Sequence, residues 1–272
     1  MSLQNKTIAF IGAGNMGEAL IRGLLSTKTV APSQITAADA RPERCEFFTK
    51  HFGIPTTADN ATAARYADVV LLAIKPQQMS TVLAGLKSVT ASLRLIISIA
   101  AGVTTSRIER ELGGIARVVR VMPNIPALVG AGAAALAKGS LATDEDVATA
   151  EAILGAVGMT VRVDEKLMDA VTALSGSGPA YVFYVTEAMV KAGVAAGLDE
   201  GLAKKLAIQT VFGAAKLLIE SGEAPESLRR KVTSPGGTTE AALRVMSERK
   251  LMEIFTEAVK AAEKKSRELS GL

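Results

Sequence analysis

A glycine motif between an apolar run and a helical pattern constrains the fold of this chain most strongly. Residues 7–11 form the run, and Gly12, Gly14 and Gly17 follow in a G-x-G-x-x-G spacing before apolar residues recur at helical intervals. Asp39 comes 22 residues after Gly17, at the end of a second predicted strand. This order of strand, glycine turn, helix and acidic residue is typical of a Rossmann βαβ unit that binds a dinucleotide.

The rest of the chain divides into a strand-rich part and a helical part. Apolar runs that alternate with helical patterns predict strands at residues 34–38, 69–73, 95–99 and 118–121, with outer strands at 133–137 and 160–163. Continuous apolar strands separated by helices favour an α/β fold with a doubly wound parallel sheet. Beyond about residue 166 the pattern is helical, at 180–196, 201–221 and 238–272. We therefore expect a Rossmann-like domain over residues 1–165 and an all-helical domain over residues 166–272.

The composition excludes several classes of protein. The 272 residues are 49% hydrophobic and 21% charged, which suits two globular domains. Lys and Arg exceed Asp and Glu by only 31 to 27 and aromatic residues make up 4%, so we expect no nucleic-acid partner. The longest uncharged runs, 121–137 and 170–186, are interrupted by Pro and Gly, so we expect no membrane span.

Two reactive residue types occur once each. Cys45 is the single cysteine and His51 the single histidine, so neither an intrachain disulfide, a Ser/His/Asp set nor a His-rich metal site is expected. Residues 1–6 lack the basic and apolar pattern of a signal peptide, and a cytoplasmic location is expected.

The last helical pattern suggests an oligomer. Leu251, Ile254, Phe255, Ala258 and Ala262 form an apolar stripe at helical spacing that needs a partner surface. A homodimer would supply that surface, because the helical part is short and strongly apolar. The alternative is an ordinary stripe that packs within one chain.

The ends of the predicted strands supply further cofactor-binding candidates. Asp39 suits an adenosine ribose and would repel a 2′-phosphate, whereas Arg41 could neutralise one, so the residues leave NADPH and NADH open. Other contacts are expected where later strands end, although both segments could be plain turns: Ala73, Ile74, Lys75 and Pro76, and Met122, Pro123 and Asn124.

Two glycine-containing segments of the helical part are candidates for the substrate. Ser175 and Gly176 precede a long apolar helix, where glycine permits close approach of the nicotinamide or of a second subunit. The segment 234–239 reads Ser-Pro-Gly-Gly-Thr-Thr, and its glycines permit a turn that brings the amides of Gly237 and Thr238 to one side, where a carboxylate would fit. The alternative is a Thr N-cap on a surface helix.

Five motifs together resemble the pyrroline-5-carboxylate reductase family over essentially the whole chain. They are FIGAGNMG at residues 10–17, LAIKPQ at 72–77, RVMPNIP at 120–126, LSGSGPAY at 174–181 and VTSPGGTT at 232–239, of which the last two are the most specific. The resemblance implies reduction of the cyclic imine 1-pyrroline-5-carboxylate to L-proline with NADPH or NADH, the last step of proline biosynthesis. It also implies a Rossmann domain, a helical dimerisation domain and a homodimer, with assembly into a larger homo-oligomer left open.

The same resemblance implies a set of site residues. The substrate carboxylate would meet Gly237 and Thr238, the Thr239 hydroxyl would hydrogen-bond the ring nitrogen as the catalytic group, and Ser175, Gly176, Ser234 and Gly236 complete the substrate set. The family often has a small hydroxyl or amide residue where Asp39 stands, so this departure leaves the cofactor preference open. The cofactor set is Ile11, Gly12, Ala13, Gly14, Asn15, Met16, Gly17, Asp39, Arg41, Asn60, Ala73, Ile74, Lys75, Pro76, Met122, Pro123 and Asn124.

Three alternatives remain beside this interpretation. Lys75 is a competing proton donor, ranked below Thr239 because a residue before Pro76 is held extended. A β-hydroxyacid dehydrogenase shares the two-domain plan and typically has a catalytic Lys in the helical domain, followed by an Asn. Here Lys191 is followed by Ala, Gly, Val and Ala, so that arrangement is absent. A nucleotide-sensing protein could keep the first glycine motif, although it would not need the segment 234–239.

Overall fold

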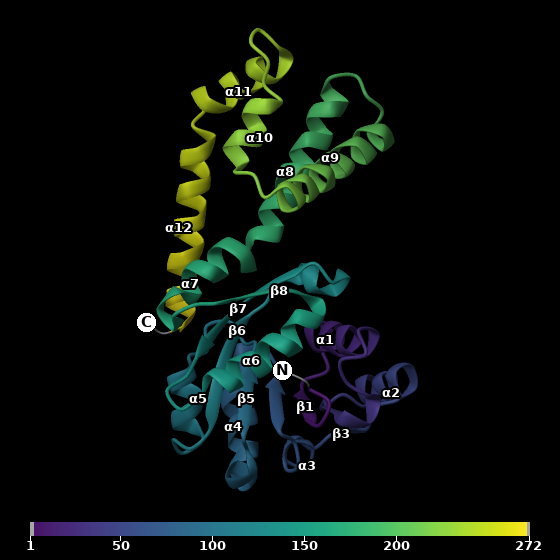
Figure 1. The fold of residues 1–272 in the computed structure, drawn as a ribbon, viewed down its shortest axis with the longest axis vertical. Coiled ribbons are helices and arrows are strands. Elements are labelled where there is room, and N and C mark those ends of the chain that lie inside the picture. Colours follow the sequence, from purple (N-terminus) through teal and green to yellow (C-terminus); the bar gives the residue numbers. More distant parts are fainter. Residues whose placement is uncertain (1–2, 271–272) are drawn as a thin grey trace. The chain divides into compact units, whose positions relative to one another are not determined.

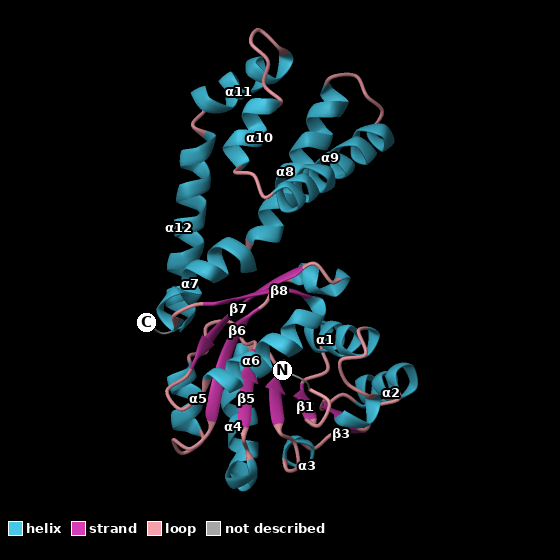
Figure 2. Ribbon diagram, viewed as in Figure 1, coloured by secondary structure: helices cyan, strands magenta, loops and turns pink. Residues whose placement is uncertain are grey.

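The strands form one sheet of eight, and β1 (Ile8–Ile11) lies inside it. We describe residues 3–270 of the computed structural model, in which the strand order is β3-β2-β1-β4-β5-β6-β7-β8 (Figures 1 and 2). The remaining strands are β2 (Ile35–Ala38), β3 (Thr56–Thr57), β4 (Val69–Leu72), β5 (Leu95–Ser98), β6 (Arg117–Met122), β7 (Gly132–Lys138) and β8 (Gly158–Arg162).

Each face of the sheet has its own apolar core. Ile8 and Phe10 belong to one buried cluster and Ala9 and Ile11 to another, because successive side chains of a strand point to opposite faces. The first cluster takes side chains from α1 (Asn15–Ser26), α2 (Pro42–Phe52) and α6 (Asp144–Leu154). The second takes them from α3 (Asn60–Ala64), α4 (Met79–Leu86) and α5 (Thr105–Glu111). The predicted doubly wound α/β fold is confirmed.

The sheet departs from the prediction in one respect, since β7 runs antiparallel to β6. Only a 3₁₀ segment, Ile125–Val129, lies between these strands, whereas a parallel pair needs a crossover of a dozen or more residues. The connection from β7 to β8 contains α6, and that pair is parallel. The short edge strand β3 had no recognisable signal in the sequence.

The chain forms two compact units that do not divide at residue 165. Unit 1 comprises the described residues up to Ser177 together with those from Ala262 onward, and unit 2 comprises Gly178–Ala261. The helix α7 (Met168–Val171) belongs to unit 1 because Met168 is buried against Ala135 and Ala137 of β7. The end of α12 (Leu251–Ser270) belongs there too. Its Ser266 hydroxyl donates a 2.6 Å hydrogen bond to the buried Asp169 carboxylate.

Unit 2 is entirely helical, as the sequence predicted. It contains α8 (Gly178–Ala195), α9 (Glu200–Ser221), α10 (Pro225–Lys231), α11 (Thr238–Glu248) and the first part of α12. Only Ala203 and Ala207 are buried within it, where α9 packs on α8. Many of its large apolar side chains are exposed, among them Phe183, Tyr184, Phe212, Ile219 and Met252.

Candidate active site

A cleft of about 790 Å³ opens in unit 1 where several strands end. Its walls include the first glycine turn and the residues that follow β2, β4 and β6. Ligands bind at this edge of doubly wound sheets. Of the residues assigned to the cofactor from the sequence, the cleft is lined by Ile11, Gly12, Gly14, Asn15, Met16, Asp39, Arg41, Asn60, Ala73, Ile74, Lys75, Pro76, Met122 and Pro123.

The three glycines of the first motif have different surroundings. A Cβ on Gly12 would lie 2.5 Å from the Ala73 carbonyl oxygen, and one on Gly17 would lie 2.7 Å from the Gly12 carbonyl oxygen, so both positions need close backbone packing. A Cβ on Gly14 would meet no atom within 4 Å and would project into open space. Gly14 therefore leaves room for a group that approaches the backbone, as a pyrophosphate does.

The start of α1 offers hydrogen-bond donors to that space. Gly14 is its N-cap residue, and no side chain caps the helix. The first amides of a helix lack acceptors within it, and the helix dipole adds a partial positive charge at the same end. Asn15 and Met16 line the cleft at this point. The residues present thus fit the phosphates of a dinucleotide.

Three residues of the predicted cofactor set lie behind the cleft instead of lining it. Ala13 is buried, and its N–H donates to Asp39 Oδ2 at 2.8 Å. Gly17 packs against the backbone of Gly12. The Asn124 side chain accepts the Ala133 N–H at 2.8 Å and donates to the Ser175 carbonyl oxygen at 3.1 Å. Asn124 therefore connects the end of β6 to the neighbouring chain segments.

The Ser175 and Gly176 segment forms a π-helical turn, Thr172–Gly176. Such turns are rare and occur frequently at functional sites. A Cβ on Gly176 would lie 2.6 Å from Cε of Met122, so glycine permits this turn to pack on a residue that lines the cleft. The Ser175 hydroxyl donates to the Val171 carbonyl oxygen at 3.2 Å.

One wall of the cleft was not predicted from the sequence. Ile99, Ala100 and Ala101 follow β5 and line it, as do Ala40, Gln78 and Val82. The strand predicted at 95–99 ends at this edge of the sheet like its neighbours, so its position could have identified the first three. Lys75 also lines the cleft, and its backbone is extended at φ −69° and ψ 145°, as the following proline predicts.

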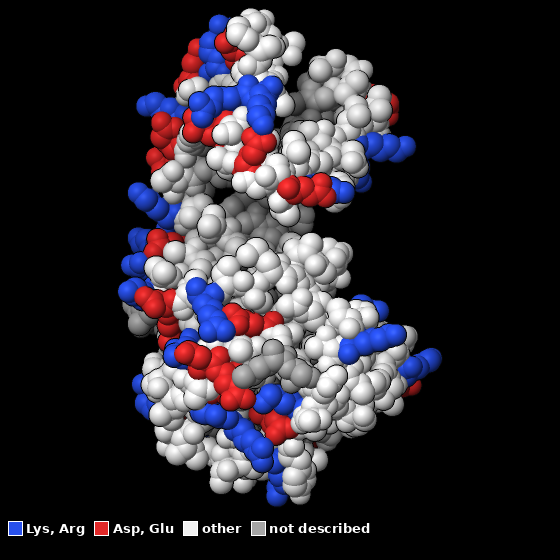
Figure 3. Space-filling view, in the orientation of Figure 1, with Lys and Arg blue, Asp and Glu red and all other residues white. Residues whose placement is uncertain are grey.

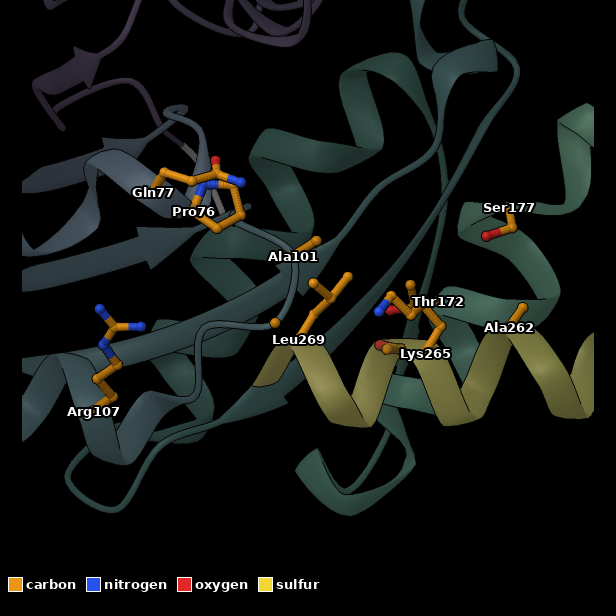
Figure 4. Close-up of a pocket in the computed structure, with 11 residues that line it drawn as sticks. Pro76, Gln77, Ala101, Arg107, Thr172, Ser177, Ala262, Lys265 and Leu269 are labelled. Atoms are coloured by element: carbon orange, nitrogen blue, oxygen red, sulfur yellow. The ribbon is translucent and has the colours of Figure 1, made fainter. Parts of the chain in front are cut away.

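A second cavity, of about 520 Å³, adjoins the cleft within unit 1. It shares Pro76 and Ala101 with the cleft, and Thr172, Lys265 and Leu269 contribute to its lining (Figure 4). Figure 4 shows Lys265 and Leu269 on the helix α12, beside Thr172 of the π-helical turn. The space at the end of the sheet therefore continues beyond the cofactor cleft.

Asp39 is the most strongly perturbed acid in the cleft. Burial alone would raise the pKa of its carboxyl, but hydrogen bonds from the Arg41 side chain and from the backbone of Arg41 and Ala13 outweigh burial and lower the pKa to about 2. Arg41 Nε lies 2.9 Å from Asp39 Oδ1. Asp39 is thus an ionised, paired carboxylate at any pH where the protein works.

The second glycine segment forms a turn before α11 in unit 2. Gly236 has φ +71°, a conformation that favours glycine, and its N–H donates to Glu240 Oε2 at 2.8 Å. The Gly237 N–H donates to the Ser234 carbonyl oxygen at 3.0 Å, so this predicted carboxylate donor is engaged within the turn. Gly237 is the N-cap residue and no side chain caps α11, so neither Thr238 nor Thr239 is an N-cap.

Further observations bear on other classes of site. Between residues 3 and 270, no group of three or more His, Cys, Asp and Glu side chains is arranged to hold a metal ion. Among the described helices, none has the length and apolarity that crossing a bilayer requires. On the face shown in Figure 3, Lys and Arg side chains are interspersed with Asp and Glu.

Comparisons with known proteins agree with the fold. A family model described as pyrroline-5-carboxylate reductase dimerisation matches residues 165–269, and one described as NADP oxidoreductase, coenzyme F420-dependent, matches residues 7–102. The pyrroline-5-carboxylate reductase of Methanosarcina acetivorans is 46% identical over 267 residues, which are 98% of this chain and 99% of the relative. That of Synechocystis sp. is 44% identical over 269 residues, 99% of each chain.

Two solved structures are similar over the same length. A pyrroline-5-carboxylate reductase from Coxiella burnetii has a TM-score of 0.94 at 40% identity and covers 98% of this chain and 99% of its own. A pyrroline carboxylate reductase from Plasmodium falciparum, solved with NADP bound, has a TM-score of 0.86 at 30% identity with the same coverage. Identity at this level over nearly the whole length places the chain in the pyrroline-5-carboxylate reductase family.

Proposed function

We propose that this chain reduces 1-pyrroline-5-carboxylate to L-proline with NADPH or NADH, the last step of proline biosynthesis. Its family membership supports the reaction, and the open space in front of Gly14, at the uncapped start of α1, is the observation that carries the cofactor assignment. When bound there, the reduced nicotinamide supplies a hydride for the imine carbon.

The residues of unit 1 would bind and orient the cofactor. The amides at the start of α1 would hold the phosphates, and Asp39, Arg41 and Asn60 lie on the part of the cleft that suits the adenosine ribose. Ala73, Lys75 and Pro76, together with Met122 and Pro123, would enclose the nicotinamide. Because the imine is electrophilic once its nitrogen is protonated, positioning is the main requirement on the protein.

The turn before α11 would bind the substrate. Its Gly237 amide is engaged with Ser234, so the amide of Thr238, at the start of the helix, is the better donor to the carboxylate. We assign the proton or hydrogen bond at the ring nitrogen to the Thr239 hydroxyl, which caps no helix amide. Ser234, Gly236, Ser175 and Gly176 complete the proposed substrate set.

Substitution of Thr239 tests the catalytic assignment. Thr239→Val keeps the shape of the side chain and removes the hydroxyl, and we expect kcat to fall about 10²-fold, within the range for loss of a positioned proton donor or oxyanion donor. Thr239→Ser is the matched control, because it keeps the hydroxyl and should retain most of the rate. Steady-state rates with pyrroline-5-carboxylate, followed at the nicotinamide absorbance, measure both.

The competing donor is tested in the same assay. Equal kcat values for the Val and Ser variants at saturating substrate would remove Thr239 from the chemical step. Lys75→Met should then show the large loss instead, because Lys75 is the other proton donor proposed for the reaction and lines the cofactor cleft.

The homodimer is part of the proposal. A unit with two buried side chains and exposed Phe183, Tyr184 and Phe212 lacks a core of its own, and apolar surface of this extent marks an interaction site. The match to the family's dimerisation model covers the same helices. A cytoplasmic location is also proposed, and it suits the free thiol of Cys45, since thiols persist under reducing conditions.

A further inference from the structure

Asp39 stands where a Rossmann protein reads the adenosine ribose, but its carboxylate is already fully engaged. Oδ1 accepts the backbone N–H and Nε of Arg41 at 3.0 and 2.9 Å. Oδ2 accepts Nη2 of Arg41 at 3.0 Å and the Ala13 N–H at 2.8 Å. A carboxylate has about four lone-pair sites, so these four donors leave no acceptor for a ribose hydroxyl. The Asp39 side chain is only 9% exposed.

Arg44 holds the Ala13 backbone on the other side of its Cα, at the carbonyl. Its Nε donates to the Ala13 carbonyl oxygen at 2.7 Å, and its Nη2 lies 2.8 Å from Glu18 Oε2. The guanidinium carbon sits 4.9 Å from the ring centroid of Phe47 and 5.0 Å from that of Phe48. The residue between Gly12 and Gly14 is therefore fixed at its N–H by a carboxylate and at its carbonyl by a guanidinium.

Arg41 is more exposed to the cleft than Arg44. Its side chain is 55% exposed and lines the cleft, whereas Arg44 is 21% exposed and does not. Asp39 takes Nε and Nη2 of Arg41, and Nη1 donates no hydrogen bond to any of residues 3–270. The hydrogen bonds and charge of Asp39 raise the pKa of Arg41, and the charge of Glu43 adds to this effect, so Arg41 is held in its cationic form. A guanidinium held along one edge presents its remaining N–H groups in a fixed direction, the geometry that suits a phosphate.

We propose that Asp39 and Arg44 clamp the glycine turn through Ala13, and that Arg41, oriented by Asp39, binds the 2′-phosphate of NADPH. This inference rests on the proposed function. Asp39 then makes no direct contact with the ribose, because its charge is balanced by Arg41 and its lone pairs are filled, and it affects the choice of cofactor only through Arg41. Arg44 becomes a positioning residue that acts on both cofactors equally, and the chain favours NADPH over NADH through Arg41.

Binding of two nucleotide fragments separates the roles. Adenosine 2′,5′-bisphosphate carries the 2′-phosphate and AMP does not, and titration calorimetry of the whole protein gives both Kd values without any turnover. Arg41→Ala should raise the Kd of the bisphosphate by about 10-fold or more, since a charge-assisted hydrogen bond is lost, and leave the Kd of AMP unchanged. Arg44→Ala should weaken the binding of both fragments by a similar factor. Asp39→Asn should also weaken the binding of both, and of the bisphosphate more than of AMP, because Arg41 loses the carboxylate that orients it.

Arg22→Ala is the matched control for Arg44→Ala. Arg22 also pairs with Glu18, at 2.9 Å, and lies over the ring of Phe52, but its side chain donates no hydrogen bond to Ala13. We expect Arg22→Ala to leave both Kd values within twofold of the parent. If Arg44→Ala and Arg22→Ala behave alike, the clamp is refuted. A gain in bisphosphate binding relative to AMP for Asp39→Asn would make Asp39 the residue that reads the 2′ position.

Activity measurements keep this proposal distinct from the proposed function. If the fragments respond as expected but pyrroline-5-carboxylate is not reduced, the reaction assignment fails and the clamp stands. If the parent reduces the imine while Arg41→Ala lowers kcat/KM equally for NADPH and NADH, the assignment of Arg41 fails and the reaction stands.

Discussion

The two units of this chain bury their apolar residues in opposite ways. In unit 1 both faces of the sheet are covered, and side chains such as Phe10, Phe48 and Leu71 are fully buried. In unit 2 only Ala203 and Ala207 are buried, while Phe212 and Ile219 are exposed. A sheet with helices on both faces completes its core within one copy, whereas the helices of unit 2 leave much of their apolar surface uncovered. Unit 1 thus has a complete core, and completion by a partner is proposed for unit 2 alone.

Removal of a core side chain from unit 1 should give the largest effect. Phe10→Ala leaves a cavity in a closely packed core, and such changes cost about 3–5 kcal/mol in the free energy of unfolding. Urea unfolding followed by circular dichroism measures the loss, which should not depend on protein concentration. If the loss grows on dilution, the core of unit 1 is not self-sufficient and the contrast between the units is wrong.

A charge placed on the apolar stripe of α12 tests the other side of the comparison. Phe255→Asp should shift the solution mass towards the monomer, because an unpaired carboxylate would be buried in the interface. At a given protein concentration it should also lower the free energy of unfolding by about 1–3 kcal/mol. Light scattering over a dilution series measures the mass, and urea unfolding at a fixed concentration measures the loss of stability. Thr256→Asp adds the same charge at the adjacent position outside the stripe and should leave the mass unchanged. A Phe255→Asp variant with the parent's mass and stability would place Phe255 on free surface.

The smallest expected effect is the pH dependence of the glycine-turn clamp in unit 1. The pKa of Asp39 is lowered from its ordinary value of 3.8 to about 2, so its ionised form stabilises the fold above pH 4 and this contribution is lost as the pH falls towards 2. Parent and Asp39→Asn should differ in stability by at most about 1 kcal/mol at pH 7, because the pair is partly exposed. Their urea midpoints should converge between pH 4 and pH 2, and a constant difference would mean that charge is not involved.

Local patterns predicted the sheet because the apolar residues of each strand directly reflect its burial. Residues 69–72 are four consecutive apolar residues, and they form a strand buried on both faces. The direction of β7 was not predictable in the same way, because direction depends on whether the connection crosses the sheet, and the 3₁₀ segment Ile125–Val129 carries no strong pattern of its own. The boundary near residue 177 depends on the burial of Met168 against β7, a contact between residues distant in sequence.

In the candidate site, backbone conformation could be predicted from the sequence but side-chain pairing could not. Backbone conformation follows from residue type, so the turn at Gly12 and the extended backbone of Lys75 were accessible from the sequence. Side-chain pairing was not, because it depends on the fold. Ala13 and Asp39 are 26 residues apart, and nothing in the intervening residues indicates that the carboxylate faces the glycine turn. Arg44 carried no motif, and only its contact with the Ala13 carbonyl identifies it.

The return of α12 to unit 1 has a consequence for how the chain is made. Asp169 and Ser266 are 97 residues apart in sequence, and the whole of unit 2 is synthesised between them. A ribosome releases the N-terminal segments first, so the sheet can form while the residues that cover Asp169 are still untranslated. During that interval the Asp169 carboxylate lacks both its hydroxyl partner and the helix that covers it. This contact therefore closes only after synthesis is nearly complete, and it is a late step of folding.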